Sequence, residues 1–244
     1  MSKSAGWVLY VSVACVAAIA RGAEPAVPVY DAVYTVEYKG KNLGSSEFKV
    51  THDAAQNSYE FTLTTTAKGL LAKFAAPNPT IERSRFTVVD GRVRPSEYTK
   101  KDGSRKGDDD RQITFDWERH TAIVTDKDGR REVALEELSL DPGSLYVALM
   151  RDLILNGRPG QYRIADGDQA KDYGFTDNGD AQTETGLGKL ATHSYIQHRD
   201  GSSRSTYLWV APSLEYLPAR IETRKGDEVQ TALTLVSVEG IEKQ

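Results

Sequence analysis

Cysteine is almost absent from this chain, which limits both how the protein is stabilised and what chemistry it can carry. The single cysteine, Cys15, lies in an apolar N-terminal run from Trp7 to Ala20. Cleavage by signal peptidase after Ala20 would remove it. The mature chain would then have no disulfide and no thiolate metal ligand, so burial of apolar side chains must stabilise it.

Histidine is also scarce, and its arrangement predicts neither catalysis nor metal binding. The chain has four histidines. His193 and His198 are five residues apart in a predicted strand, which places them on opposite faces and prevents them from chelating one ion. Neither a His-Glu-x-x-His motif nor a Gly-x-Ser-x-Gly motif is present. The sequence therefore predicts no catalytic residue, no metal site and no cofactor.

Residues 1–20 have the pattern of a secretory signal peptide. Lys3 precedes the apolar run, and Ala18-Ile19-Ala20 supplies the small residues of a cleavage site. The run is shorter than the roughly 20 residues that a helix needs to cross a bilayer, so we expect no membrane span in the mature chain. We expect a periplasmic or secreted protein in which residues 21–244 form a single β-rich domain. The alternative is a lipoprotein anchored through Cys15.

The charge of the chain is mildly acidic and evenly distributed. Its 31 basic and 35 acidic residues give a formal net charge of −4, and removal of Lys3 with the signal would change this to −5. Nucleic-acid binding requires clustered basic residues with few acids between them, whereas here the signs alternate. The composition therefore excludes nucleic acid as the expected partner.

Most of the mature chain alternates between apolar and polar residues, as half-buried strands do. Turn signals such as Asp90-Gly91 and Asn178-Gly179 separate these strands, and Pro95 indicates a sheet edge or a bulge. The last strand, 229–238, is apolar on both faces, which is typical of a central strand. Strands recur about every 10–12 residues. We therefore predict a mainly β fold, a single curved or spiralled antiparallel sheet, open-barrel-like, that wraps one main α-helix.

That helix is expected at about residues 141–155. Asp141 is a good N-cap residue and Pro142 suits the first turn. Two adjoining apolar stripes follow, formed by Leu145, Leu149 and Leu153 and by Tyr146, Met150 and Ile154. A stripe this wide predicts a helix buried inside the sheet, with the last strand as its partner.

Several short motifs follow one another along the mature chain. They are Tyr34-x-Val-x-Tyr38 with Gly44 after it, Val93-x-Pro95-x-x-Tyr98, Asp141-Pro-x-Ser144, Trp209-Val-Ala211 and Pro218-x-Arg220. Their order and spacing resemble the bacterial envelope family known as domain of unknown function 3108, over nearly the whole mature chain. The family tends to have an acidic residue shortly after the tryptophan strand, where this chain has Pro212-Ser213. The resemblance implies a periplasmic, β-rich protein whose curved sheet wraps a helix, and it implies no particular activity.

Acidic clusters offer a possible calcium site, but a structural interpretation suits them better. The clusters lie at residues 108–110, 126–128 and 177–180. Oxygen-rich loops suit calcium, yet none of the three has the full twelve-residue calcium loop with its closing glutamate. Aspartate, asparagine and glycine are also the residues expected at hairpin tips, which is how we interpret these clusters.

The candidate binding residues are apolar side chains that the strand pattern does not explain. Leu70, Leu71 and Phe74 lie in an apolar flap bracketed by Gly69 and two prolines, and Trp117 and Trp209 end apolar strand faces. These five residues could line a groove for an acyl chain or an extended partner. The alternative is that all five are part of the core.

Three functions are consistent with these patterns. The first is a non-enzymatic periplasmic envelope protein that binds a lipid-like, hydrophobic ligand or an envelope protein partner. The second is a hydrolase of envelope polymers that uses a pair of carboxylates, of which one has a pKa raised by burial. The third is a scaffold that pairs with a partner strand through an open sheet edge.

Overall fold

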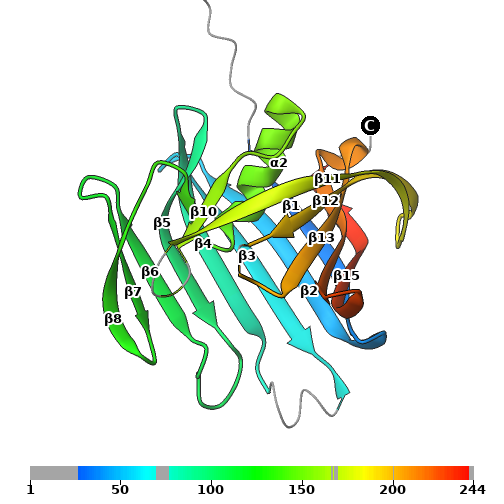
Figure 1. Cartoon of the computed structure of the whole chain (residues 1–244), viewed down its shortest axis with the longest axis horizontal. Coiled ribbons are helices and arrows are strands. Elements are labelled where there is room, and N and C mark those ends of the chain that lie inside the picture. The colour runs from blue at the N-terminus through cyan, green and yellow to red at the C-terminus, as the bar shows by residue number, and fades with distance from the viewer. Residues whose placement is uncertain (1–26, 70–76, 166, 168–169, 200, 242–244) are drawn as a thin grey trace, which may run out of the picture.

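In the part of the chain that the structure describes, one large coiled sheet wraps around a helix. The computed structural model describes residues 27–69, 77–165, 167, 170–199 and 201–241. Its 15 strands form one sheet in the order β8-β7-β6-β5-β4-β3-β2-β1-β15-β14-β13-β12-β11-β10-β9, and Figure 1 shows helix α2 (Ser144–Asn156) within its curve. Neighbouring strands are antiparallel except β9 and β10, which are parallel. The predicted mainly β fold, with a spiralled sheet around one helix, is confirmed.

The strands alternate between inward and outward side chains along most of their length. In chain order they are β1 (Tyr30–Tyr38), β2 (Lys41–Asp53), β3 (Ser58–Ala67), β4 (Thr80–Val89), β5 (Arg92–Lys101), β6 (Arg111–Asp116), β7 (Thr121–Asp126), β8 (Gly129–Ala134), β9 (Ser139–Leu140), β10 (Tyr162–Ala165), β11 (Ala170–Thr185), β12 (Gly188–His198), β13 (Arg204–Ala211), β14 (Leu217–Lys225) and β15 (Glu228–Glu239). A short 3-10 turn, η1 (Pro212–Leu214), precedes β14. No helix in these described ranges is long and apolar enough to cross a membrane.

The first and last strands meet at the centre of the sheet. β1 pairs with β15 along nearly its whole length, and the Tyr34 hydroxyl on β1 donates to the Pro218 carbonyl on β14 at 2.9 Å. The prediction that the last strand is central is therefore confirmed. Ala232 and Leu235, which lie on opposite faces of the strand, are both buried, whereas Val236 is exposed.

Both ends of the sheet curl inward. Ala165 of β10 and Ala170 of β11 belong to one buried cluster with Ile113 of β6. The turn between β11 and β12 returns to β15, where the Gly186 amide donates to the Leu235 carbonyl at 2.8 Å. A β-carbon at residue 186 would lie 2.4 Å from the carbonyl oxygen of residue 236, so this close approach requires glycine.

Helix α2 packs on a different part of the sheet from the one expected. Tyr146 makes ring contacts with Phe48 of β2 and Phe61 of β3, with centroids 5.3 and 5.9 Å apart. The strands nearest to the helix backbone are β5 and β4 rather than β15. The chain enters α2 directly from β9, and β9 lies beside β5, which explains this position. The last strand contributes Leu235 to the same core cluster.

The start of α2 is built around a buried carboxylate. Asp141 is inaccessible to solvent, and its Oδ1 accepts the amides of Gly143 and Ser144 at 2.8 and 2.9 Å while Oδ2 accepts the Ser84 hydroxyl at 2.7 Å. The helix itself begins at Ser144 with Gly143 in the N-cap position. Asp141 thus satisfies amides at the helix start, as expected, but from two residues further upstream. Burial raises its pKa to about 6, against the opposing effect of these hydrogen bonds.

The structure has bulges at Pro95, where one was predicted, and at Asn178-Gly179, where a turn was predicted. Pro95 lies beside a register shift in the β4–β5 pair, so the predicted bulge is confirmed. Asn178-Gly179, by contrast, was expected to be a turn and is a bulge inside β11, opposite Ser194 of β12. The correction has a local cause, because Asp177 accepts the Gly179 amide at 2.8 Å and the Asn178 side chain donates to the Ser194 hydroxyl at 3.1 Å. The one extra residue is accommodated without ending the strand.

Candidate functional site

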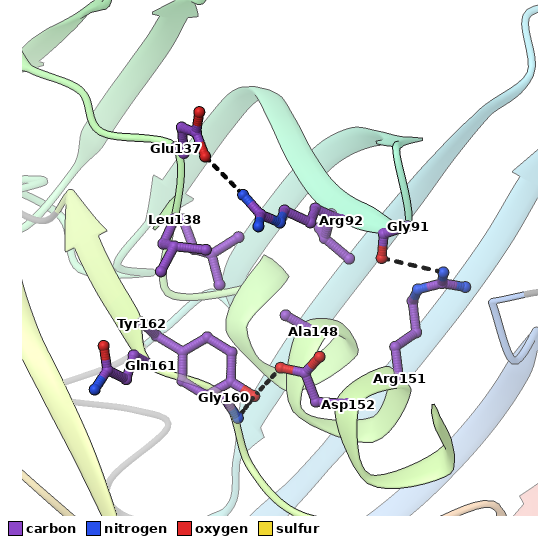
Figure 2. A pocket seen from close by; sticks show the side chains of 12 residues that line it. Gly91, Arg92, Glu137, Leu138, Ala148, Arg151, Asp152, Gly160, Gln161 and Tyr162 are labelled. Carbon is purple, nitrogen blue, oxygen red and sulfur yellow. Dashed lines mark hydrogen bonds and ion pairs between the residues drawn. The ribbon is translucent and has the colours of Figure 1, made fainter. Parts of the chain in front are cut away.

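A groove lies where α2, the β4–β5 turn and the β9–β10 pair meet (Figure 2). It consists of two adjoining cavities of about 170 and 410 Å³ that share Leu138, Gln161 and Tyr162. We call it the β9–β10 groove. The first cavity is lined chiefly by Arg92, Val93, Glu137, Ala148, Arg151 and Asp152, and the second by Glu136, Arg163, Asp172, Tyr173, Gly174 and His198.

The β4–β5 turn forms one wall of the first cavity. Asp90 and Gly91 have φ values of 50° and 76°, the left-handed conformation that their dipeptide predicts for a hairpin turn. This turn brings the Gly91 carbonyl to Arg151 on α2, whose Nη2 donates to it at 3.4 Å. Arg151 is buried, so a charged side chain connects the helix to the turn behind the cavity (Figure 2).

The opposite wall is fixed by a hydrogen-bonded tyrosine. The Tyr162 hydroxyl donates to Asp152 Oδ2 at 2.6 Å and accepts the Gly160 amide at 2.9 Å. Burial raises the pKa of Asp152, and the hydrogen bond from Tyr162 partly offsets this effect. Burial and then the Asp152 charge raise the pKa of Tyr162 well above its usual range. These hydrogen bonds fix the position of α2 relative to the start of β10.

Leu138 lies where the two cavities join, with charged residues on both sides. Its exposed fraction is 40%, which is high for a leucine that lines a cavity. On one side Arg92 pairs with Glu137 at 2.8 Å. On the other, Arg163 pairs with Glu136 at 3.3 Å and with Asp172 at 3.1 Å. The groove therefore has an apolar centre between two sets of ion pairs.

The groove has only part of what carboxylate catalysis requires. Asp152 has the raised pKa expected of a general acid, but its Oδ2 accepts the Tyr162 hydroxyl. The other carboxylate of the first cavity, Glu137, is largely exposed and paired with Arg92. Within the described residues, no group of three metal-binding side chains could hold an ion.

The acidic clusters are occupied by contacts within the protein. Asp126 is paired with Arg131 at 2.6 Å, which lowers the pKa of the aspartate. Asp110 accepts the Lys101 ammonium at 2.7 Å and the Asp102 amide at 2.9 Å. The Asp177–Asp180 cluster lies at the β11 bulge and not at a hairpin tip as expected, and both aspartates contact the His193 ring.

Of the five residues predicted for binding, only Trp117 and Trp209 lie in the described part of the chain. Leu70, Leu71 and Phe74 lie outside the described residues. Trp117 follows β6, stacks on Phe115 and donates from Nε1 to the Pro95 carbonyl at 2.6 Å.

Trp209 lies far from Trp117 in the strand order. It is on β13 and stacks on Tyr207, and the Arg224 guanidinium lies over both rings. Between β6 and β13 the sheet order places β5, β4, β3, β2, β1, β15 and β14. Neither tryptophan lines the β9–β10 groove.

The groove was not predicted, although the sequence held two signals of it. Arg151 and Asp152 interrupt the apolar pattern in the middle of a helix that is otherwise suited to burial. Charged residues are rarely buried unless they are paired, so adjacent charges there indicate a polar site beside the helix. Leu138 is a large apolar residue just upstream of the helix, outside both the strand and the helix pattern.

Comparisons with known proteins identify a family and distant fold relatives. The family model described as "Protein of unknown function (DUF3108)" matches residues 33–233. No curated protein matches the chain. A solved structure from Bacteroides fragilis, described as an exported protein with a YmcC-like fold, is 11% identical over 88% of this chain and 97% of its own, with a TM-score of 0.37. A protein from Parabacteroides distasonis, described as a lipoprotein, is 9% identical over 88% of this chain and 97% of its own, with a TM-score of 0.34.

Proposed function

Since the chain belongs to the DUF3108 family, whose model spans residues 33–233, we propose that it is a non-enzymatic envelope protein that binds a partner protein in the β9–β10 groove. The predicted signal peptide, residues 1–20, would deliver it to the periplasm. The single observation that carries the proposal is Leu138, exposed where two cavities meet and flanked by ion pairs. An apolar centre with a charged rim is the usual arrangement of a protein interface.

The lining of the groove favours a polypeptide over a lipid chain. Sites for small hydrophobic molecules are lined predominantly by apolar and aromatic side chains and usually enclose roughly 300–1,000 Å³. The first cavity is smaller, at about 170 Å³, and both cavities carry arginine and carboxylate side chains. An extended segment with one apolar residue and polar neighbours matches this lining better than an acyl chain does.

Site-specific crosslinking in intact cells tests this proposal. We would place a photoreactive residue at Gln161, which lines both cavities, in three backgrounds: unchanged, Leu138→Asp and Leu155→Asp. Leu155 is the matched control because it is 43% exposed but lines neither cavity. We expect crosslinks to one segment of one protein, lost with Leu138→Asp because its charge must be buried on binding, and retained with Leu155→Asp.

Three other outcomes of the crosslinking experiment would each contradict the proposal. A lipid-mass adduct in place of a protein crosslink would favour the lipid-like ligand and overturn the choice of partner made here. Protein crosslinks that survive Leu138→Asp would show that the contact at residue 161 does not use the groove. No specific adduct of either kind would also contradict the proposal.

A second candidate, the hydrolase, depends on Asp152. Its carboxylate lines the groove and has a pKa raised by burial, as a general acid needs. If it acts in this way, Asp152→Asn abolishes release of sugars or peptides from isolated envelope polymers while the fold is kept, because the amide oxygen still accepts the Tyr162 hydroxyl. The partner-binding proposal expects no such release from either the unchanged protein or the variant.

A further inference from the structure

One edge of strand β11 is open from Gly174 onward. Residues 170–173 of β11 pair with β10 on one side, whereas Gly174–Thr185 pair with β12 alone among the described strands. Six of these twelve residues are exposed, five are half-buried and Thr183 is buried. Figure 1 shows β11 as a long strand that continues well past the end of β10. The far end of β11 approaches β14 and β15, so the unpaired backbone that an additional strand can use is the part next to the groove.

The open edge begins where the β9–β10 groove ends. The second cavity of the groove is lined by Asp172, Tyr173 and Gly174, so its wall runs onto the first residue of β11 that has only one neighbouring strand. The His198 ring lies close against Gly174, which marks the cavity end. A segment leaving the groove past residue 173 would therefore come to the open edge of β11.

Along the second cavity and the open edge of β11, the most exposed charged side chains are acidic. Acids pair with basic side chains at each position, but the acid is more exposed in every pair. The side chains of Asp172 and Arg163 are 80% and 32% exposed, and those of Glu184 and Lys189 are 77% and 59% exposed. The same holds for Glu137 with Arg92 and for Asp177 and Asp180 with His193. β11 itself carries four acids and a single basic residue, Lys171.

From these features we infer that the occupant is an extended, lysine- or arginine-rich segment of a partner protein that adds as a strand to the open edge of β11. The inference rests on the proposed function, since it treats groove and edge as one site. Strand addition supplies affinity through main-chain hydrogen bonds. The exposed acids select a basic segment and accelerate its association.

The bulge in β11 limits how far the added strand can extend. Asn178 and Gly179 interrupt the regular ladder, and His193 contacts Asp177 at 2.9 Å and Asp180 at 2.6 Å across the bulge. A bulge bends the strand and disrupts the regular spacing of its hydrogen bonds. Backbone pairing is therefore restricted to Gly174–Asp177, and Asp180 and Glu184 beyond it contribute charge alone.

Three short synthetic peptides serve as probes. The first alternates lysine and valine, the second alternates glutamate and valine, and the third is the lysine peptide with every second amide N-methylated so that it cannot complete a ladder. We expect the lysine peptide to bind with at least about tenfold higher affinity than either of the others, a difference of roughly 1.4 kcal/mol. Hydrogen exchange should slow at residues 174–177 and stay unchanged at 181–185.

Charge reversal on the protein provides the matched control. Asp172→Lys with Glu184→Lys should weaken binding of the lysine peptide at least about tenfold at low salt, as the acidic path is removed. Glu47→Lys with Glu239→Lys makes the same charge change at exposed residues on β2 and β15 and should leave the affinity unchanged. If the first pair does not fold, Asp172→Asn with Glu184→Gln removes the charges without reversal and should weaken binding to a smaller extent.

Two results would overturn the inference. Equal binding of the N-methylated peptide would show attraction without strand addition, and equal binding of the glutamate peptide would show that the acids do not select the partner. Both results leave the proposed function untouched if crosslinking at residue 161 still depends on Leu138. If crosslinking at residue 161 did not depend on Leu138 but the lysine peptide bound normally, the proposed function would be contradicted and the strand-addition inference would not.

Discussion

Replacing Leu149 with aspartate unfolds the protein. Leu149 is 1% exposed and packs with Leu153 of the helix and with Tyr195, Leu208 and Val210 of β12 and β13. Tyr146, one turn before Leu149, packs on Phe48 of β2 and Phe61 of β3. The helix is therefore enclosed by the sheet, and a side chain at residue 149 has no route to solvent.

The expected loss of stability exceeds what a domain of this kind can absorb. Truncation of a buried leucine alone costs about 2–5 kcal/mol. An uncompensated buried charge adds several kcal/mol more, against a typical total stability of roughly 5–15 kcal/mol. Urea denaturation followed by circular dichroism measures the effect. Leu155→Asp changes an exposed residue of the same helix and should keep a midpoint close to that of the unchanged protein.

A folded Leu149→Asp protein that loses only partner binding would contradict this account. Such a result would mean that this face of α2 is a binding surface rather than the interior of the sheet.

Asp141 makes stability fall as pH rises between about 4 and 6. Its pKa is near the ordinary value of 3.8 when the chain is unfolded and about 6 in the folded protein, because burial penalises the charged carboxylate. Between these two values the folded state binds more protons than the unfolded state, so stability decreases as pH increases. At about 1.36 kcal/mol per pKa unit, this group lowers the free energy of unfolding by roughly 3 kcal/mol from pH 4 to pH 7.

Asp141→Asn separates this effect from the structural role of the residue. The amide oxygen can still accept the Gly143 and Ser144 amides, so the helix start is retained, while the titrating group is lost. Urea denaturation at several pH values should show a slope in this window that is smaller for Asp141→Asn than for the unchanged protein. Asp141→Ala is the control for loss of the cap and should be destabilised at every pH, because buried amides lose their acceptor. Identical pH slopes for Asp141→Asn and the unchanged protein would contradict this assignment.

The architecture was predictable because it depends on local patterns. Alternation of apolar and polar residues predicted the long antiparallel sheet, and the apolar stripes around Leu149 predicted the buried helix. The bulge at Asn178-Gly179 was misjudged because that dipeptide suits both a turn and a bulge, and the choice depends on whether a partner strand continues beside it.

The candidate site was harder to predict because it is assembled from segments far apart in the sequence. Arg92, Leu138 and Tyr162 meet only because β9 lies beside β5 and pairs with β10. Periodicity determines which face of a strand is buried, but it carries no information about which distant strands adjoin. Apolar character alone singled out Trp117 and Trp209, whose rings pack in separate surroundings on the sheet.

The role proposed for Leu138 is that of the apolar centre of a partner-binding groove. Its most direct test is the equilibrium affinity of the protein for the segment captured by crosslinking at residue 161, measured for the unchanged chain, Leu138→Asp and Leu155→Asp. We predict that Leu138→Asp weakens binding at least about tenfold, or roughly 1.4 kcal/mol, while Leu155→Asp leaves it unchanged. Equal affinities for all three proteins, each shown to be folded, would contradict the claim.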